Sequence, residues 1–167
     1  QVVRAAVFPI DMTEHKLFQE TLATERSLLE MVVDNLPEFI FAKDSQGRFL
    51  FVNQAVANYF QYASKEDIYG KTDFDIMDQG WARFHAEEEK EILTKNRPMI
   101  NREYQAPDLA GRVRWYLSTK IPWYDPHGRA LGLVGLNYEI TERKEAEETL
   151  RKAHEELERR VAERTAE

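Results

Sequence analysis

Three aspartates lie close together in the segment GKTDFDIMDQG and could bind a cation or transfer protons. An EF-hand loop needs oxygen ligands at alternate positions and a glycine at a fixed place among them. Asp73, Asp75 and Asp78 do not keep that spacing, and the nearby glycines are misplaced. We therefore expect these acids to cap short helices. The chain also has no P-loop, nucleophile elbow or HExxH motif, so we predict no catalytic activity of its own.

The composition excludes several kinds of site. The 167 residues include no Cys, which rules out disulfides, thiolate zinc sites, thiol nucleophiles and covalently attached c-type haem. The formal net charge of −7 argues against binding to nucleic acid or to an anionic membrane, because both need clustered Lys and Arg. A chain without Cys is consistent with the cytoplasm, where we expect it to act.

Alternation divides the strand-like segment RVRWYLSTKI into two faces. The residues of one face are Val113, Trp115, Leu117, Thr119 and Ile121. The residues of the other face are Arg112, Arg114, Tyr116, Ser118 and Lys120. Amphipathicity alone would bury the first face and leave the second in water.

The elements that must position these residues are both strands and helices. FIFAKDSQGRFLFVN predicts a β-hairpin, and Asn53 at its end could cap a short helix. A longer helix is expected at about residues 81–96, followed by three strands separated by the turns DLAG and DPHG. This order predicts an α+β fold with one five-stranded antiparallel sheet and helices gathered on one face.

A long helix is expected at each end of this domain. In the first, residues 13–36, Thr13 is the predicted N-cap and Pro37 ends the helix. Its heptad positions are Phe18, Leu22, Glu25, Leu29, Val32 and Leu36. This stripe fits a dimeric coil and packing on its own domain equally well. In the second, residues 141–167, a thin apolar stripe and Glu–Arg pairs four residues apart are typical of a coiled-coil connector.

A near repeat links the two ends of the chain, because IDMTEHKLFQETL near the N-terminus is similar to YEITERKEAEETL near the C-terminus. The strand order, the segments FVNQAV and GKTDFD, and a last strand ending in Glu-Ile-Thr before a charged helix together resemble a PAS domain. PAS domains are sensory modules of bacterial signalling proteins. The family's usual ending is Asp-Ile-Thr, so Glu139 keeps the carboxylate on a longer arm.

The resemblance implies four parts, because PAS modules occur in series joined by linker helices. Residues 1–12 would be the last strand of a preceding PAS domain, and residues 13–36 the linker helix that follows it. Residues 37–140 would be a complete PAS domain. Residues 141–167 would be a coiled-coil linker into an output domain, which we expect to be a histidine kinase, with a diguanylate cyclase as the alternative.

The resemblance also implies a pocket between the sheet and the small helices. Comparison with flavin- and haem-binding relatives places four residues inside it: Tyr116, Ser118, Lys120 and Asn137. A buried Lys120 needs a partner, because an unpaired buried ammonium is strongly unfavourable. The candidates are a salt bridge to Asp73 or Asp75 and an anionic ligand. The remaining alternative is that Lys120 is exposed to solvent.

His85 lies where haem-binding PAS domains carry their iron ligand, so a haem-based gas sensor is one alternative. Its surroundings, FHAEEEKE, are strongly acidic, look like a solvated face and favour an exposed or packing histidine instead. The absence of Cys rules out flavin–cysteinyl photochemistry. A small molecule bound without a covalent bond remains compatible with the chain.

Two functions follow from these predictions. In one, the domain binds a small molecule and signals through its C-terminal helix; in the other, it is a ligand-free dimerising spacer. In both, we expect a homodimer formed through the linker helices, contacts with adjacent PAS and output domains, and no direct membrane contact. The expected signalling hinge is Glu139, Ile140 and Thr141, with the Glu139 charge anchoring the start of the helix.

Overall fold

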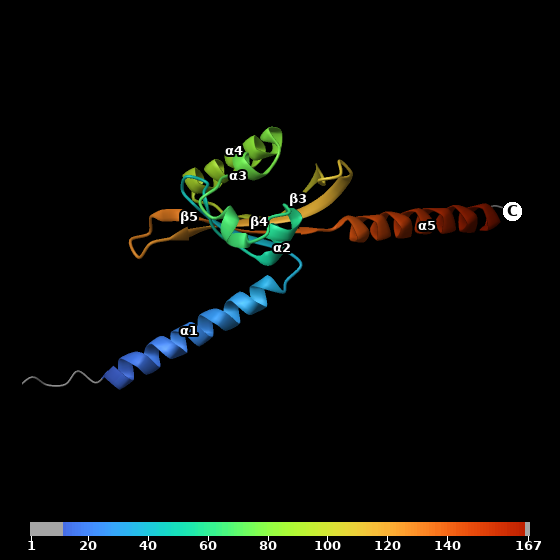
Figure 1. Ribbon diagram of the computed structural model, residues 1–167. Coiled ribbons are helices and arrows are strands. Elements are labelled where there is room, and N and C mark those ends of the chain that lie inside the picture. The colour runs from blue at the N-terminus through green and yellow to red at the C-terminus, as the bar shows by residue number, and fades with distance from the viewer. Residues whose placement is uncertain (1–11, 166–167) are drawn as a thin grey trace, which may run out of the picture.

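An antiparallel sheet with helices on one face forms the centre of the molecule, and a long helix leaves it at each end (Figure 1). The computed structural model describes residues 12–165, with side chains from residue 15 onward. The strand expected within residues 1–12 lies outside the described residues, apart from Met12, where α1 begins.

Five antiparallel strands form the sheet in the order β2-β1-β5-β4-β3. The strands are β1 Phe39–Asp44, β2 Phe49–Val52, β3 Met99–Pro107, β4 Val113–Tyr124 and β5 Ala130–Glu139. Asp44 closes the first hairpin, because its Oδ1 accepts the backbone N–H groups of Gln46 and Arg48. Gly47 in this turn has a φ of 77°, which glycine adopts without strain. The predicted five-stranded antiparallel sheet is confirmed.

Three short helical elements and one longer helix cover one face of the sheet. They are α2 Gln54–Tyr59, the 3-10 turn η1 Lys65–Ile68, α3 Asp73–Ile76 and α4 Gln79–Lys95. Asn53 caps α2, and Thr72 and Asp75 form a capping box at α3. Asp78 accepts the Gly80 N–H at 2.8 Å at the start of α4. Asp75 and Asp78 therefore cap helices as predicted. The same prediction is wrong for Asp73, whose buried carboxylate pairs with Lys43.

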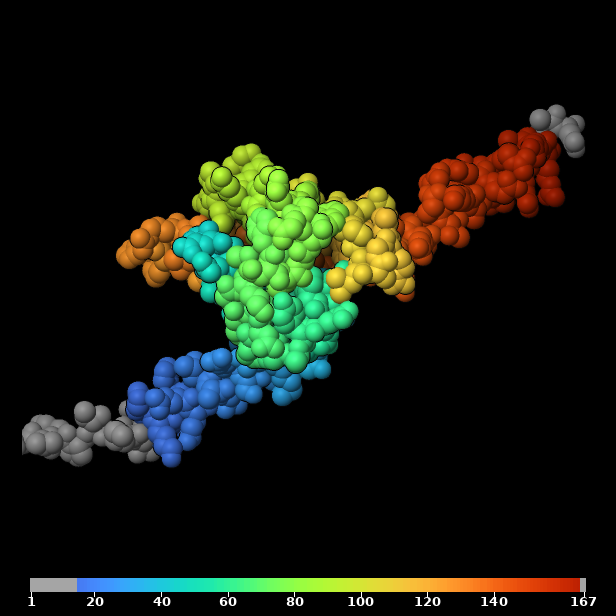
Figure 2. Space-filling model, turned by 45° about the horizontal axis from the view of Figure 1, so that its top comes forward, coloured from blue at the N-terminus to red at the C-terminus, as the bar shows by residue number. Residues whose placement is uncertain are grey.

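The terminal helices α1 Met12–Asp34 and α5 Thr141–Thr165 project away from the sheet, and Figure 2 shows both extending beyond the central domain. Side chains of the α1 heptad stripe are exposed, with Phe18 and Leu29 each 66% accessible. Most of this stripe is therefore not buried against its own domain. Among residues 12–165, no helix combines the length and apolarity needed to cross a bilayer.

Asn53 joins the end of α1 to the sheet. Its side chain is fully buried, and its Nδ2 donates to the carbonyl oxygens of Glu38 at 2.8 Å and Val33 at 3.1 Å. Its Oδ1 accepts the Ile40 N–H of β1 at 3.1 Å. One buried amide therefore binds the last turn of α1, the start of β1 and, as the N-cap, the start of α2.

The hydrophobic core lies between the sheet and the short helices. Its buried members are Phe41, Phe49, Val52, Val56, Ala57, Ile68 and Leu133. Gly135 of β5 is the register partner of Phe41 in β1. A Cβ at this glycine would lie 2.1 Å from the Phe41 ring, so the ring lies over β5 only because position 135 has no side chain.

Candidate ligand cavity and hinge

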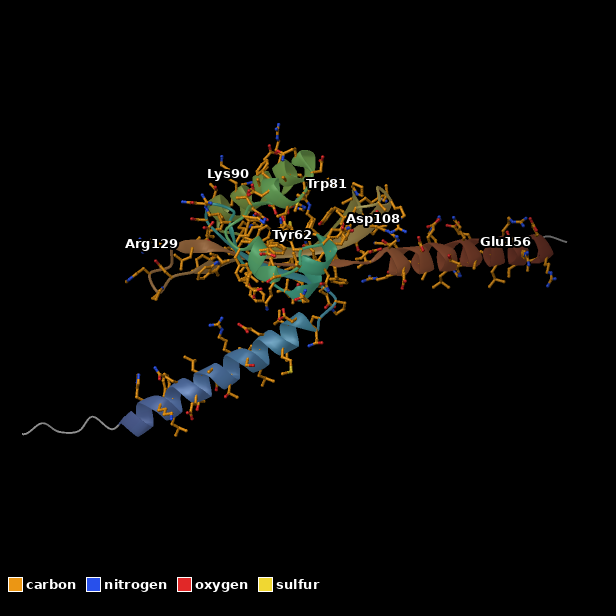
Figure 3. The ribbon with its side chains drawn as sticks, viewed as in Figure 1. Tyr62, Trp81, Lys90, Asp108, Arg129 and Glu156 are labelled. Carbon is orange, nitrogen blue, oxygen red and sulfur yellow. The ribbon has the colours of Figure 1, made fainter. Side chains whose placement is uncertain are left out.

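A cavity of about 320 Å³ lies between the inner face of the sheet, α2 and the start of α4. Its walls are mainly aromatic, and the aromatic residues that line it are Phe39, Phe41, Phe49, Tyr59, Phe60, Trp81, Tyr104 and Tyr116. At one end, Met77 and Asp78 border it from the α3–α4 connection, and residues 107–109 border it from the β3–β4 turn. Figure 3 labels two of the lining residues, Trp81 in the first turn of α4 and Asp108 in the β3–β4 turn. This volume is at the small end of ligand pockets.

The aromatic side chains pack in two groups that border the same cavity. In the first, the Trp81 ring centroid lies 6.2 Å from that of Tyr104, and Tyr104 stacks on Tyr116 at 5.8 Å. In the second, the Phe39 ring of β1 packs against Tyr59 of α2 at 4.9 Å. The packed rings hold one another in place and give the cavity rigid apolar walls.

Three of the four predicted ligand contacts, Tyr116, Lys120 and Asn137, line the cavity. Ser118 is not among the lining residues, and its hydroxyl donates to the Asn137 Oδ1 at 2.5 Å. Tyr116, Ser118 and Lys120 are 5%, 1% and 0% exposed. The structure therefore turns this face of β4 inward, as the resemblance implied, and the interpretation from amphipathicity alone is wrong. Their role in binding a ligand stays a prediction.

Two fully buried lysines lie beside the cavity and share one carboxylate of α4. Lys43 Nζ of β1 lies 2.9 Å from Glu89 and 2.5 Å from Asp73. Lys120 Nζ of β4 lies 3.0 Å from Glu89 and 2.8 Å from Glu88. Glu89 is 5% exposed, so these contacts form away from water. They attach α3 and α4 to the sheet.

The predicted salt bridge of Lys120 with Asp73 or Asp75 is wrong. Asp73 contacts Lys43 instead, and Asp75 is exposed and accepts the Thr72 N–H and hydroxyl at 2.8 Å each. The reason is the packing, because α4 and not α3 lies against β4. The alternative of an exposed Lys120 is also wrong, since its side chain is fully buried.

Arg102 of β3 completes this group of charges by pairing with Glu88 at 2.8 Å. The group is called the buried ion cluster here because five of its members are buried: Lys43, Asp73, Glu88, Glu89 and Lys120. Arg102 is the sixth member, and its side chain is 49% exposed. The cluster holds three cationic and three carboxylate side chains and is therefore balanced in charge.

Lys43 and Glu89 were not among the residues selected from the sequence, although each left a signal. Lys43 follows Phe41 by two positions and so lies on the same face of β1. Glu89 lies three residues before Ile92 and seven after Ala82, a spacing that puts all three on one face of α4. In both cases the signal was a charged residue on the same face of its strand or helix as apolar residues that are buried.

The pKa values of the cluster follow from burial and the shared charges. Burial alone would raise the pKa of Glu89, but Lys43 and Lys120 outweigh it and lower that pKa. Burial raises the pKa of Asp73, and the neighbouring Glu89 adds to this increase. Burial would lower the pKa of Lys120, but Glu89 and Glu88 raise it. The Lys120–Glu89 pair is therefore ionic at neutral pH.

His85 of α4 borders the cavity beside this cluster. Its Nδ1 lies 3.4 Å from Lys120 Nζ, and its ring packs edge-on against Phe84 and Tyr104. Burial, followed by the positive charge of Lys120, lowers the His85 pKa to about 3, so the ring is neutral at physiological pH. The interpretation of its surroundings as a solvated face is wrong, and His85 is a packing histidine.

The surroundings of His85 do not fit an iron ligand. An ammonium group can only donate hydrogen bonds, so Nδ1 accepts from Lys120 and the ring proton lies on Nε2. A protonated Nε2 has no lone pair for a metal. The haem alternative therefore has no support from this side chain.

Stability should depend on pH through His85. The free energy of unfolding should fall as the pH drops from 6.5 to about 3, because His85 binds a proton only in the unfolded state over this range. The contribution of His85 to the slope of unfolding free energy against pH approaches ~1.4 kcal/mol per pH unit. Urea unfolding between about pH 7 and about pH 5 measures this slope.

The matched variants are His85→Gln and His127→Gln, since His127 lies in the exposed turn after β4. His85→Gln should lose part of the pH dependence, and His127→Gln should keep the parental slope. If both variants lose the same amount, the His85 ring is not held neutral by its surroundings.

The last strand passes directly into α5, and two hydrogen bonds tie this junction to β4. The Ile140 N–H donates to the Trp115 carbonyl at 2.8 Å, and the Trp115 N–H donates to the Thr141 hydroxyl at 3.0 Å. Ile140 and Thr141 are 3% and 7% exposed. The first residue of α5 is therefore held by the strand that lines the cavity.

Glu139 contacts the sheet and not α5. Its carboxylate lies 3.5 Å from Arg114 of β4, and its side chain is 45% exposed. The first turn of α5 is instead tied to β3, because Lys144 pairs with Glu103 at 2.5 Å. In the structure, Thr141 and Lys144 hold the start of α5, and the Glu139 charge lies on the strand side of the junction.

Comparison with known proteins agrees with this architecture. The model of the PAS fold family matches residues 33–145, more than half of the chain. A diguanylate cyclase of Vibrio cholerae is 26% identical over 125 residues, which cover 74% of this chain and 39% of that protein. The methanogenesis regulatory histidine kinase FilI of Methanothrix harundinacea is 26% identical over 137 residues, covering 81% and 15%. The chain thus spans less than two fifths of these relatives.

A solved structure shows the same fold. The PAS domain of BvgS from Bordetella pertussis superposes with a TM-score of 0.57 at 28% identity, covering 81% of this chain and 98% of that one. The chain therefore belongs to the PAS family of sensory modules.

Proposed function

We propose that this PAS domain is a signal-relay module whose cavity binds a small molecule and whose hinge passes the resulting change to α5. The observation that carries the proposal is that β4 serves both parts. Tyr116 and Lys120 border the cavity, and the adjacent Trp115 is bonded to Ile140 and Thr141. A ligand that moves β4 would therefore disturb the bonds that hold the start of α5.

Association of two copies through the terminal helices is the second part of the proposal. Phe18 and Leu29 are exposed along α1, and Leu150 and Leu157 are 72% and 60% exposed along α5. Apolar residues at such spacings are normally buried against a second helix. Two copies joined along these helices would bury both stripes and couple the two hinges.

The output domain would lie elsewhere in the same protein. A histidine kinase and a diguanylate cyclase both contain a segment similar to this one, which supports an output of either kind. We propose a histidine kinase, with a cyclase as the alternative.

Native mass spectrometry of the purified chain tests binding and association in one spectrum. We expect a dimer that carries a discrete additional mass. A dimer that retains no small molecule would favour the ligand-free spacer. A monomer without additional mass would contradict both parts of the proposal.

The hinge has its own test in Thr141→Val, which removes the hydroxyl that accepts the Trp115 N–H. Loss of this bond should weaken the junction by ~1 kcal/mol, which is about a fivefold increase in amide exchange in the first turn of α5. Hydrogen exchange followed by mass spectrometry measures it. Glu139→Ala should have less effect, because its pair with Arg114 is exposed.

Thr149→Val is the matched control, because the Thr149 hydroxyl donates only within α5, to the Glu145 carbonyl at 2.8 Å. It should leave exchange at the first turn unchanged. Equal exchange in the two Thr→Val variants would show that the Thr141 hydroxyl does not hold the hinge.

A further inference from the structure

We infer that the cavity is suited to a neutral, flat aromatic molecule that carries hydrogen-bond acceptors, such as an aromatic carboxamide, and not to a carboxylate or an amine. The inference rests on the proposed ligand-binding function and adds the chemical class of the ligand. Three properties of the cavity carry it: its charge balance, the arrangement of its rings and the kind of polar groups that it presents.

A carboxylate ligand would have to compete with groups already in place. Lys120 is the cationic residue that lines the cavity. Its ammonium group already forms salt bridges with Glu88 at 2.8 Å and with Glu89 at 3.0 Å. A carboxylate ligand that displaced Glu89 from Lys120 would leave the buried Glu89 carboxylate with Lys43 as its remaining cationic partner. Asp78 also borders the cavity and opposes the approach of an anion.

A cationic ligand meets the same difficulty. Asp73 and Glu89, the acids that line the inner part, are held by Lys43 at 2.5 and 2.9 Å. At the β3–β4 turn, Arg112 and Arg114 pair with Asp108 at 2.9 and 3.2 Å. Asp78 has no cationic partner among the described residues, but it is exposed and accepts the Gly80 N–H at the start of α4. In the inner part of the cavity, where the charges already neutralise one another, an ionic ligand would lose its hydration without gaining an unpaired counter-ion.

The rings favour a flat ligand. Trp81 and Tyr104 are inclined by 36° and Tyr104 and Tyr116 by 27°, so the planes of the three rings are tilted only moderately between neighbours. Phe39 and Tyr59 form a second aromatic wall of the same cavity. A flat ring can stack on such faces and fill a small apolar volume at little entropic cost.

The uncharged polar side chains of this cavity mainly offer hydrogen-bond donors to a ligand. Asn137 uses its Oδ1 to accept the Ser118 hydroxyl, so its amide N–H groups are the part that it can offer to a ligand. His85 carries its proton on Nε2, because Nδ1 faces Lys120. Burial raises the pKa of Tyr104, so its hydroxyl remains a donor. Carbonyl oxygens or ring nitrogens are the acceptors that fit these groups.

Four probes of similar size separate these properties: benzamide, benzoate, benzylammonium and cyclohexanecarboxamide. Titration into the ¹⁵N-labelled chain can be followed at the indole N–H of Trp81, which borders the cavity. The reference is the indole of Trp123, which donates to the Lys43 carbonyl and does not line the cavity. We expect benzamide to shift the Trp81 signal saturably. Each charged probe should bind at least about tenfold more weakly, and the non-aromatic amide about threefold more weakly.

Tyr104→Phe and Tyr124→Phe form a matched pair of variants. Tyr124 is 42% exposed, and its hydroxyl contacts Asn96 outside the cavity. Tyr104→Phe should weaken benzamide about three- to tenfold, and Tyr124→Phe should leave it unchanged. Equal effects of the two variants would overturn the donor part of the inference.

The outcomes separate the ligand class from the binding function. If benzoate or benzylammonium binds as tightly as benzamide, the inferred class is wrong while ligand binding stands. If cyclohexanecarboxamide equals benzamide, the requirement for a flat ring is wrong. If no probe moves the Trp81 signal and the purified dimer carries no additional mass, both the class and the ligand-binding function are wrong.

Discussion

Replacing Glu89 with glutamine should lower the free energy of unfolding by about 3–5 kcal/mol, because it leaves two buried ammonium groups without their shared carboxylate. Lys43 and Lys120 contact Glu89 at 2.9 and 3.0 Å, and both lysines are at most 1% exposed. Asp73 and Glu88 would remain as single partners. Equilibrium urea unfolding at neutral pH measures the loss.

Glu91→Gln on the same helix is the matched control. Glu91 pairs with Lys95 at 2.5 Å, but both side chains are more than 60% exposed, so the expected change is below ~1 kcal/mol. Similar losses in the two variants would mean that the buried ion cluster contributes no more to stability than a surface pair.

Gly135→Ala should be the second large effect. The new Cβ would lie 2.1 Å from the Phe41 ring, which must then leave its position over β5. Overpacking of this kind destabilises by about 1–3 kcal/mol, measured as a lower midpoint of urea unfolding. Because Phe41 also lines the cavity, its displacement should weaken benzamide binding as well.

Gly80→Ala provides the comparison for that substitution. Its Cβ would meet only the Asp78 Oδ1, at 3.1 Å, in the first turn of α4. Asp78 is exposed, so its side chain can shift by the few tenths of an ångström that this contact requires. Alanine has the higher helix propensity, so stability should stay equal or rise by up to ~1 kcal/mol. If Gly135→Ala proves equally harmless, the Phe41 ring has room to move.

The fold could be predicted because its signals are local. Turns such as the one closed by Asp44 and Gly47 join strands whose alternation is visible over a few residues. The caps at Asn53 and Asp78 also depend only on nearby backbone groups. Each of these contacts spans at most a few positions in the chain, and sequence patterns describe such contacts well.

The partner of Lys120 could not be predicted, because it depends on which helix packs over which strand. Asp73 and Asp75 were plausible partners on charge alone, but α3 brings Asp73 to Lys43 of β1. The carboxylate of Glu89 comes from within an acidic run in which most neighbours are solvated. Because the run is strongly acidic as a whole, it was interpreted as a solvated face. The buried side of α4 and the buried environment of His85 were therefore not predicted.

The contacts of the predicted hinge could not be predicted from the sequence either. Its location came from the resemblance, and α5 begins at Thr141 as expected. The individual contacts depend on geometry across the sheet, where the Thr141 hydroxyl meets Trp115 and the Glu139 carboxylate meets Arg114. No local sequence pattern shows that Thr141, and not Glu139, makes the contact that holds the start of α5.

Under the proposed ligand-binding function, the buried amide of Asn53 would couple α1 to the cavity. It binds the Val33 carbonyl in the last turn of α1 and caps α2, whose Val56 and Tyr59 line the cavity. If the orientation of α1 changes the ligand's affinity by some factor, the ligand must bias that orientation by the same factor. A rotation of α1 and a molecule bound in the cavity would then shift the same conformational equilibrium. The orientation of α1 would set the ligand concentration needed for the change, and the bound ligand would set how much rotation of α1 is needed.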